Sequence, residues 1–182
     1  MPITANRAKT VLSWSDFQVV KPPLYDEADG KEVQAYTSFS WDLPARAPQK
    51  IDGQLALNQN IVLKIIPSDG KFPPGRPKII RGTAQTAGLL DHEQFHYDAG
   101  FVIARVVARN LMGLRKPDKP ALIIALQKLI RYHFIKRAGL IQARYDIDSR
   151  HGINNRYQRI WKQRMKNCLA NPNATQLGGY WL

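Results

Sequence analysis

The chain has 182 residues, 44% of them hydrophobic, and a formal net charge of +13. This length and hydrophobic content are those of a globular protein, so we expect a single domain over residues 1–182. No apolar run approaches the length of a transmembrane helix, and the first residues lack the apolar core of a signal peptide. The single cysteine, Cys168, excludes an internal disulfide.

The positive charge is concentrated in the second half of the chain. Residues 91–182 contain 16 lysines and arginines but only 6 acidic residues. Five of these acids, and three of the four histidines of the chain, lie within residues 91–98 and 146–151. This distribution predicts a metal site built from both segments. It also predicts a basic surface that would attract an acidic substrate or partner, or an anionic envelope.

Residues 1–82 predict a mainly β region. Candidate strands cover residues 10–20, 35–41, 53–58 and 61–66, because each is rich in β-forming or alternating side chains and is bounded by turn residues. Residues 61–66 are the best candidate for a sheet edge that pairs with an extended peptide, although their hydrophobicity also suits a central strand.

Residues 83–170 predict a mainly α region, and residues 171–182 an irregular tail. Apolar residues at helical spacing indicate three helices, over residues 83–113, 121–145 and 153–169. Thr83 or Thr86 would cap the first of them. In the third helix we expect an apolar face that points inward, made of Tyr157, Ile160, Trp161, Met165 and Cys168 or Leu169.

The first predicted helix contains the motif HExxH, whose ends are His92 and His96. Residues four apart lie about one turn apart, so both imidazoles share a face, with Glu93 beside them. Two imidazoles and a third protein ligand make a zinc site that leaves the fourth position open. We therefore expect Zn²⁺ at His92 and His96, and Glu93 as the general base that takes a proton from water. A solvated face of histidine and glutamate is the alternative.

The third metal ligand should come from the second or third predicted helix. If the second helix returns antiparallel to the first, the ligand lies about as far after the connection as His96 lies before it. His133 is within reach but belongs to an apolar stripe, which favours a core histidine. Residues 145–152 offer two carboxylates, a hydroxyl and an imidazole, and are the better candidate. The open alternatives are Asp146, Asp148, His151 and His133.

Two motifs together resemble a known family. They are His92-Glu-Gln-Phe-His-Tyr-Asp98 and Tyr145-Asp-Ile-Asp-Ser-Arg-His-Gly152, preceded by the strand-like residues 35–41. The pair is similar to the HExxH and YDxxTxHG elements of the bacterial family described as predicted secreted zinc-dependent proteases, which belongs with the zincin metallopeptidases. The resemblance covers most of the chain, about residues 35–161.

The resemblance implies a zincin-like α+β fold. A small, mostly antiparallel N-terminal sheet would pack on the HExxH helix, and a helical C-terminal part would follow. It implies a zinc metalloendopeptidase that hydrolyses a peptide or protein substrate. Ser149 stands where the family usually has threonine, which keeps the hydroxyl. Family members are commonly secreted, so the resemblance suggests a secreted or periplasmic protein, whereas the absence of a visible signal peptide leaves the cytoplasm open.

The resemblance also assigns roles in the second motif. Asp146 matches the family aspartate, and we take it as the third zinc ligand. His151 matches the family histidine and would stabilise the oxyanion if it is not itself a ligand. The segment is also similar to the GTxDxxYG element of the aspzincins, and that comparison places Asp148 at the ligand position.

A function of another class is compatible with the same sequence. Residues 131–137 and 156–166 interleave basic and aromatic side chains, as nucleic-acid-binding proteins do. The rival function is therefore a basic nucleic-acid-binding or interaction protein with a structural or vestigial zinc site. An amphipathic helix with a solvated basic face would give the same pattern without binding nucleic acid.

Overall fold

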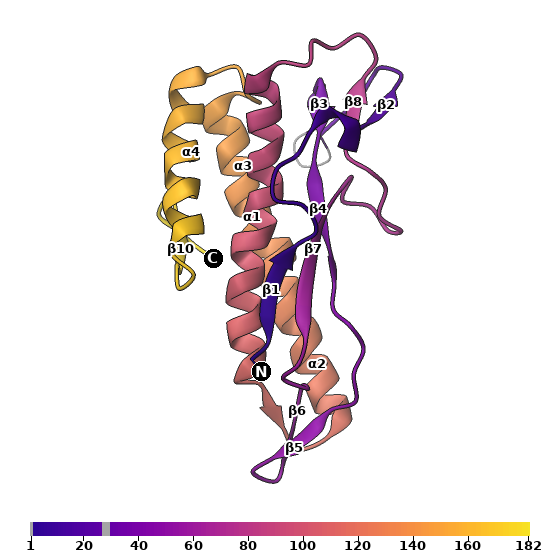
Figure 1. Cartoon of the computed structure of the whole chain (residues 1–182), viewed down its shortest axis with the longest axis vertical. Helices are drawn as coiled ribbons and strands as arrows, with labels where there is room; N and C mark the ends of the chain where they lie inside the picture. Colours follow the sequence, from indigo (N-terminus) through magenta and orange to yellow (C-terminus); the bar gives the residue numbers. More distant parts are fainter. Residues whose placement is uncertain (1, 27–29) are drawn as a thin grey trace.

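The computed structural model describes residues 2–26 and 30–182 and has an α+β fold (Figure 1). Its helices are α1 (Ala87–Met112), α2 (Lys119–Ile130), η2 (Arg131–Arg137), α3 (Ala138–Ser149) and α4 (Asn155–Ala170), with a short 3-10 turn, η1 (Trp14–Asp16). Its strands are β1 (Thr4–Arg7), β2 (Gln18–Val20), β3 (Ala35–Tyr36), β4 (Ser38–Asp42), β5 (Gln49–Ile51), β6 (Gln54–Ala56), β7 (Val62–Ser68), β8 (Lys78–Ile80), β9 (Arg115–Lys116), β10 (Gln176–Leu177) and β11 (Tyr180–Trp181).

The strands form several small sheets instead of the single sheet expected. Three sheets have three strands each, in the orders β1-β7-β4, β2-β8-β3 and β5-β6-β9. Antiparallel pairs predominate, but β1 is parallel to β7, and β2 is parallel to β8. Strands β1–β8 precede residue 83, and helices α1–α4 follow it. The expected α+β class is confirmed, and the zincin-like fold stays a prediction.

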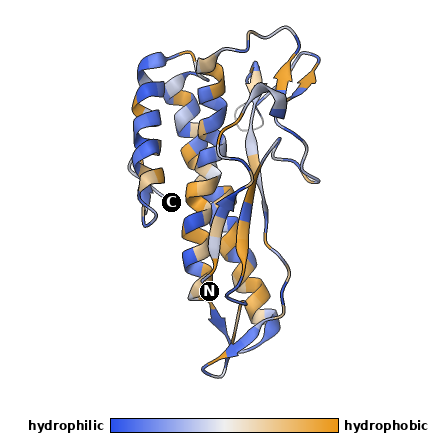
Figure 2. Cartoon of the chain, in the orientation of Figure 1, coloured by the Kyte–Doolittle hydropathy of each residue, from blue (hydrophilic) through white to orange (hydrophobic). Residues whose placement is uncertain are grey.

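The long helix α1 lies between two layers. In Figure 1, β1, β4 and β7 lie along one side of α1, and α4 lies along the other. Figure 2 shows that hydrophobic residues follow α1 and β7, whereas α4 is mostly hydrophilic. Leu63 and Ile65 of β7 are fully buried, as are Val102 and Ile103 of α1. This shared core fixes α1 against the sheet, and so fixes the backbone that carries the HExxH motif.

The prediction that residues 61–66 form the edge of a sheet is wrong. β7 covers most of residues 61–66 but lies in the centre of its sheet, because it pairs with β1 on one side and β4 on the other. Its inward side chains, Leu63 and Ile65, are both fully buried, so the hydrophobicity of the segment reflects a central strand. The edge strands of this sheet are β1 and β4, and β4 overlaps the predicted strand at residues 35–41.

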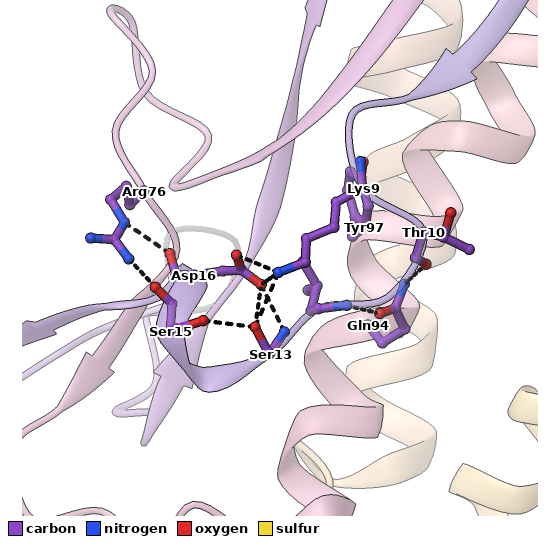
Figure 3. Close-up of polar contacts among 9 residues, drawn as sticks. Lys9, Thr10, Ser13, Ser15, Asp16, Arg76, Gln94 and Tyr97 are labelled. Atoms are coloured by element: carbon purple, nitrogen blue, oxygen red, sulfur yellow. Dashed lines mark hydrogen bonds and ion pairs between the residues drawn. The ribbon is translucent and has the colours of Figure 1, made fainter.

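The strand expected at residues 10–20 is largely wrong, since only Gln18–Val20 of this segment form a strand. Side-chain hydrogen bonds fold the preceding residues into a turn (Figure 3). Asp16 accepts hydrogen bonds from Lys9 Nζ at 2.6 and 2.7 Å and from Ser13 N at 2.7 Å. Gln94 of α1 accepts one from Leu12 N at 2.7 Å. Such local bonds compete with a strand ladder, and they attach the N-terminal segment to α1.

The helical region agrees closely with its prediction. Thr86 caps α1, because its Oγ1 accepts a hydrogen bond from Leu89 N at 3.2 Å. α2, η2 and α3 together form one helical segment, which extends beyond the predicted residues 121–145 at both ends. Its middle part, η2, is a π-helix with His133 and Phe134 buried. Among the residues described, no helix is long and apolar enough to cross a membrane.

Two expectations about the end of the chain are corrected. Trp161, Met165 and Cys168 of α4 are buried as expected, but Tyr157 and Ile160 are 42% and 36% exposed. The tail is not irregular throughout, because β10 and β11 pair as a short hairpin. Gly178 and Gly179 make its turn, with φ of 63° and 90°. These values suit the tight turns that join antiparallel strands, and a Cβ at Gly178 would lie 2.6 Å from the Trp161 ring.

Candidate metal centre

Residues from α1 and α3 meet at one buried point. α1 carries His92, Glu93 and His96 on its side towards α3, and Asp146 lies in the last turn of α3. The side chains of His92, His96 and Asp146 are 5%, 9% and 6% exposed. The structure therefore brings together the three residues that the sequence predicts as metal ligands.

Three potential ligand atoms of these residues form a nearly equilateral triangle. His92 Nε2 lies 3.2 Å from His96 Nε2, and Asp146 Oδ1 lies 3.2 Å from the first and 3.1 Å from the second. In a tetrahedral zinc site with bonds of about 2.0–2.1 Å, ligand atoms are about 3.3 Å apart. Among the described residues, the buried Asp146 Oδ1 has no hydrogen-bond partner. The donor set and its geometry thus fit a zinc ion.

The three groups differ in their protonation because each responds to burial and to its neighbours. Burial lowers the pKa of His92 to about 4, although Asp146 opposes this. Burial also disfavours a charge on His96, but the carboxylates of Asp146 and Glu93 prevail and raise its pKa to about 9. Asp146 is buried, which alone would raise its pKa, yet His96 and His92 hold it well below its usual range. Asp146 is therefore an ionised carboxylate, the form in which it can bind a cation.

Neighbouring side chains orient both histidines. His96 Nδ1 lies 3.2 Å from Gln142 Oε1, so the ring donates a proton there and directs Nε2 towards Asp146. His92 has no such partner for Nδ1 among the described residues, and its ring stacks on Tyr145 with centroids 4.8 Å apart. The sequence prediction missed Gln142. Its only signal is its position one helical turn before Asp146 on the same face.

Glu93 is almost completely buried beside the histidines. Its exposed fraction is 2%, and burial raises its pKa to about 7, although His96 and Thr37 partly oppose this. Glu93 Oε2 has no hydrogen-bond partner in the part of the chain that the structure describes. A carboxyl group with a pKa near neutrality can both accept and return a proton. The sequence prediction missed Thr37, which no motif marks.

His151 lies at the margin of the cluster. Its Nδ1 is 3.9 Å from Asp146 Oδ1 and 4.0 Å from Asp26 Oδ2, a carboxylate that the sequence prediction also missed. One ligand atom from each of His92, Asp146 and His151 can be chosen so that all lie within 4.8 Å of one another. These distances are longer than those of the first triangle. We therefore take His92, His96 and Asp146 as the better ligand set, with His151 facing it.

The backbone after α3 places His151 there. Arg150, His151 and Gly152 have φ of 51°, 49° and 88°, so the chain turns sharply back. His151 N donates a hydrogen bond to Asp146 O at 3.0 Å. Gly152 passes so close to the site that a Cβ would lie 3.3 Å from His92 Cγ. The Gly152 position therefore needs glycine both for its φ and for the close approach.

The other candidate ligands are engaged elsewhere. Asp148 Oδ2 accepts a hydrogen bond from Trp161 Nε1 at 3.0 Å, and its Oδ1 pairs with Arg144 at 3.0 Å. His133 is buried, and its Nε2 lies 3.1 Å from Asn110 Nδ2, as expected for a core histidine. Neither lies with the triangle. Asp98 lies off the ligand face, as its spacing predicts, and forms an ion pair with Arg7.

A cleft of about 660 Å³ opens onto the cluster. Residues 32–39 and Trp41 form one wall, and residues of α1, η2 and α3 form the other. The described lining includes four carboxylates and no lysine or arginine, in a chain with a net charge of +13. The carboxylates are Asp26, Glu32, Glu93 and Asp146. The cleft is thus electrostatically distinct from the basic outer surface.

Comparisons with known proteins assign the chain to no group. No protein-family model, curated protein or solved structure matches it. The resemblance to zinc-dependent proteases therefore rests on the two motifs and stays a prediction. The geometry of the cluster is an independent observation on the same residues.

Proposed function

We propose that this protein is a zinc-dependent peptidase, with His92, His96 and Asp146 as the metal ligands. The observation that carries the proposal is the triangle of His92 Nε2, His96 Nε2 and Asp146 Oδ1, with sides of 3.1–3.2 Å. Two histidines and a carboxylate as ligands, with a glutamate adjacent as base, are a set that HExxH metalloproteases use. A purely structural zinc site would need no buried carboxyl group beside it.

Glu93 is the proposed general base. Zinc held by the three ligands would act as a Lewis acid on a carbonyl group and would lower the pKa of water to about 7. Glu93 would take the proton of the attacking water and pass it to the amine that leaves. Its pKa of about 7 suits both directions of this transfer at neutral pH. Thr37, which favours its ionised form, would keep Glu93 ready to accept that proton.

His151 is the proposed oxyanion donor. Its ring lies on the cleft side of the cluster, 3.9 Å from Asp146 Oδ1, and is partly exposed. A donor aimed at the charge that develops in the transition state typically contributes about 3–4 kcal/mol to catalysis. Asp26 Oδ2 lies 4.0 Å from His151 Nδ1, on the same side of the cluster.

The proposed substrate is an extended peptide. β4 is an edge strand and its residues line the cleft, so a peptide can pair with its backbone. Because the described lining offers no lysine or arginine, an acidic side chain would find no cationic partner inside the cleft. Attraction of an acidic substrate, expected from the net charge, would therefore act through the outer surface only.

Metal content and proteolysis test this proposal together. Wild-type protein purified without chelators should hold about one zinc per chain, and His96→Ala should hold much less. Wild type should cleave a mixed peptide library, and Glu93→Gln should keep its zinc but lose cleavage. A wild-type protein that neither holds nor takes up zinc would refute the proposed peptidase. Cleavage that persists in Glu93→Gln would remove the general base from the proposal.

One observation favours the rival nucleic-acid-binding function. α4 carries five lysines and arginines, all exposed, and no acidic residue. Exposed Tyr157 stands among them, and bases stack on such rings. If this face binds nucleic acid, single-stranded DNA should bind with an affinity that falls steeply with salt. Arg156→Ala with Arg159→Ala should weaken this binding, whereas Glu93→Gln should not change it.

A further inference from the structure

We infer that one end of the cleft is a subsite for a large apolar side chain, three or four residues from the scissile peptide bond. The inference rests on the proposed function, because it names the substrate class of the same site. The subsite is formed by Phe39, Trp41, Phe134, Ile135 and Gly139, all of which line the cleft. They come from β4, η2 and α3.

The helical wall of the cleft sets the distance from the metal ligands. Ile135, Gly139, Gln142, Ala143 and Asp146 all line the cleft, and their spacing is that of a single helical face. Gly139 precedes Asp146 by two turns, or about 10 Å at 1.5 Å per residue. A side chain bound beside Gly139 would therefore lie about 10 Å from the ligand triangle.

The strand wall gives a similar distance. Gly100 follows His96 by one helical turn, about 6 Å, and a Cβ on it would meet the ring of Phe39. Trp41 is two residues beyond Phe39, about 7 Å further along an extended chain. An extended peptide advances about 3.3 Å per residue. The two walls therefore place the subsite level with the third or fourth residue from the bond that is cleaved.

The floor of the subsite is aromatic. Phe134 is 5% exposed and stacks on Trp41, with ring centroids 4.7 Å apart and planes 15° apart. Phe39 meets Phe134 edge to face at 5.6 Å. Above this floor, Trp41 and Ile135 are 37% and 60% exposed, so apolar surface remains for a ligand to cover. None of the five residues of the subsite is charged. The four carboxylates of the cleft belong to other lining residues.

Gly139 keeps the subsite open. A Cβ at this position would have no heavy atom within 4 Å, although Gly139 lies on the helical face that lines the cleft. Glycine is among the weakest helix formers, so local helix stability does not account for it. A side chain that starts from this open position would extend into the cleft that Gly139 and Phe134 both line. The position therefore offers a substitution that fills the subsite and leaves the fold intact.

Cleavage of a peptide library by the wild-type protein gives the first test. Sequencing the products should show leucine, phenylalanine or another large apolar residue enriched about tenfold at the third or fourth position on one side of the cut. Gly139→Leu should abolish this enrichment, so that large apolar residues are no more frequent at this position than in the library. The matched control is Gly88→Leu, because Gly88 also lies in a helix with no heavy atom within 4 Å of its Cβ but does not line this cleft. Gly88→Leu should keep the wild-type enrichment.

Binding without cleavage gives the second test. The best-cleaved peptide and its version with alanine at the enriched position are titrated into Glu93→Gln by calorimetry. The apolar peptide should bind about tenfold more tightly, and Gly139→Leu in the same background should abolish that difference. Equal affinities, or cleavage without enrichment at these positions, would overturn the subsite and leave the peptidase standing. A protein that neither cleaves nor binds any peptide in the library would overturn both.

Discussion

At the scale of residues, the two histidines of the cluster are held by different kinds of contact. His96 is fixed by a hydrogen bond from Nδ1 to Gln142 Oε1, at 3.2 Å. His92 is fixed by packing between the Tyr145 ring and the chain at Gly152. Only the first contact sets which ring nitrogen carries the proton. Gln142 carries no charge, but we expect it to affect metal affinity because it orients His96.

Gln142→Leu should lower zinc affinity by about 10–100-fold, because the His96 ring loses the acceptor that orients it. Competition with a chromogenic chelator measures the affinity. Gln163→Leu is the control, since Gln163 is exposed on α4 and bonds only Asn167 among the described residues. Equal affinities in wild type and Gln142→Leu would show that packing alone orients His96.

The sequence placed the proposed ligand residues close together because HExxH chemistry has a local pattern. HExxH needs only one helical turn, so His92, Glu93 and His96 could be placed without a fold. Asp146 required the second motif, and helix geometry alone left Asp148 and His133 open. Gln142, Thr37 and Asp26 are single polar residues on three different segments. No spacing relates them, so only the assembled fold brings them to the site.

At the scale of elements, the approach of β4 to α1 depends on a glycine. A Cβ on Gly100 would overlap the ring of Phe39, the β4 residue that packs on this part of α1. Gly100→Ala should lower the free energy of unfolding by about 1–3 kcal/mol, the usual cost of overpacking a core. Urea unfolding measures this, and Gly139→Ala is the control. Nothing lies within 4 Å of a Cβ at Gly139, so Gly139→Ala should be neutral or stabilising.

Asp69 ties the connection between β7 and β8 in a pH-dependent way. Its carboxylate accepts hydrogen bonds from Gly75 N at 2.9 Å and Lys71 N at 3.2 Å and pairs with Lys78 Nζ at 2.9 Å. Burial alone would raise its pKa, but these partners prevail and lower it below 3.8. The ionised form therefore stabilises the fold above the unfolded-state pKa, and this stability is lost as pH falls through the lower folded-state pKa.

Asp69→Asn should lower the free energy of unfolding at pH 7 by about 1.5–3 kcal/mol, the usual contribution of hydrogen bonds to a charged group. The difference from wild type should shrink as the pH falls below about 4, because the unfolded wild-type chain then binds a proton at Asp69, and it should vanish once the pH is below the lower folded-state pKa. Urea unfolding at pH 7 and pH 3 measures both values. A difference that stays constant with pH would mean that the charge of Asp69 contributes nothing.

Element predictions succeeded where one periodicity decided the structure. The helices follow their apolar spacing, and β7 follows its alternation, although its place inside the sheet depends on distant β1 and β4. Residues 10–20 have strand-like composition, yet the contacts of Asp16 with Lys9 and Ser13 turn the chain. The hairpin of β10 and β11 is too short for periodicity to reveal. These predictions failed because the structure of each segment depends on a distant strand or on contacts of single side chains, which periodicity does not show.

At the scale of the whole molecule, the net charge and the site have opposite signs. The chain carries +13, but the described cleft residues include four carboxylates and no lysine or arginine. A cation bound among them would be favoured by its neighbours and shielded from the basic exterior. It would also connect the start of α1 to the end of α3, which are far apart in sequence. Metal binding should therefore stabilise the entire fold.

Zinc at about 100 times its dissociation constant should stabilise the folded state by about 2.7 kcal/mol. For a chain of this size, this corresponds to a rise in the unfolding midpoint of about 5–10 °C. Glu93→Gln should keep the rise, because Glu93 is not a proposed ligand. Asp146→Asn should lose it, since the amide cannot replace the charged oxygen that faces both histidines.

Asp148→Asn separates the two aspartates in the same experiment. It should lower the midpoint without zinc, because Asp148 bonds Trp161 Nε1 and pairs with Arg144, but it should keep the rise on adding zinc. Thermal unfolding followed by circular dichroism measures both quantities in each variant. A zinc-dependent rise that survives in Asp146→Asn and disappears in Asp148→Asn would move the third ligand to Asp148. The α3 helix would then have to turn its last residues towards α1, against the contacts that Trp161 and Arg144 now make.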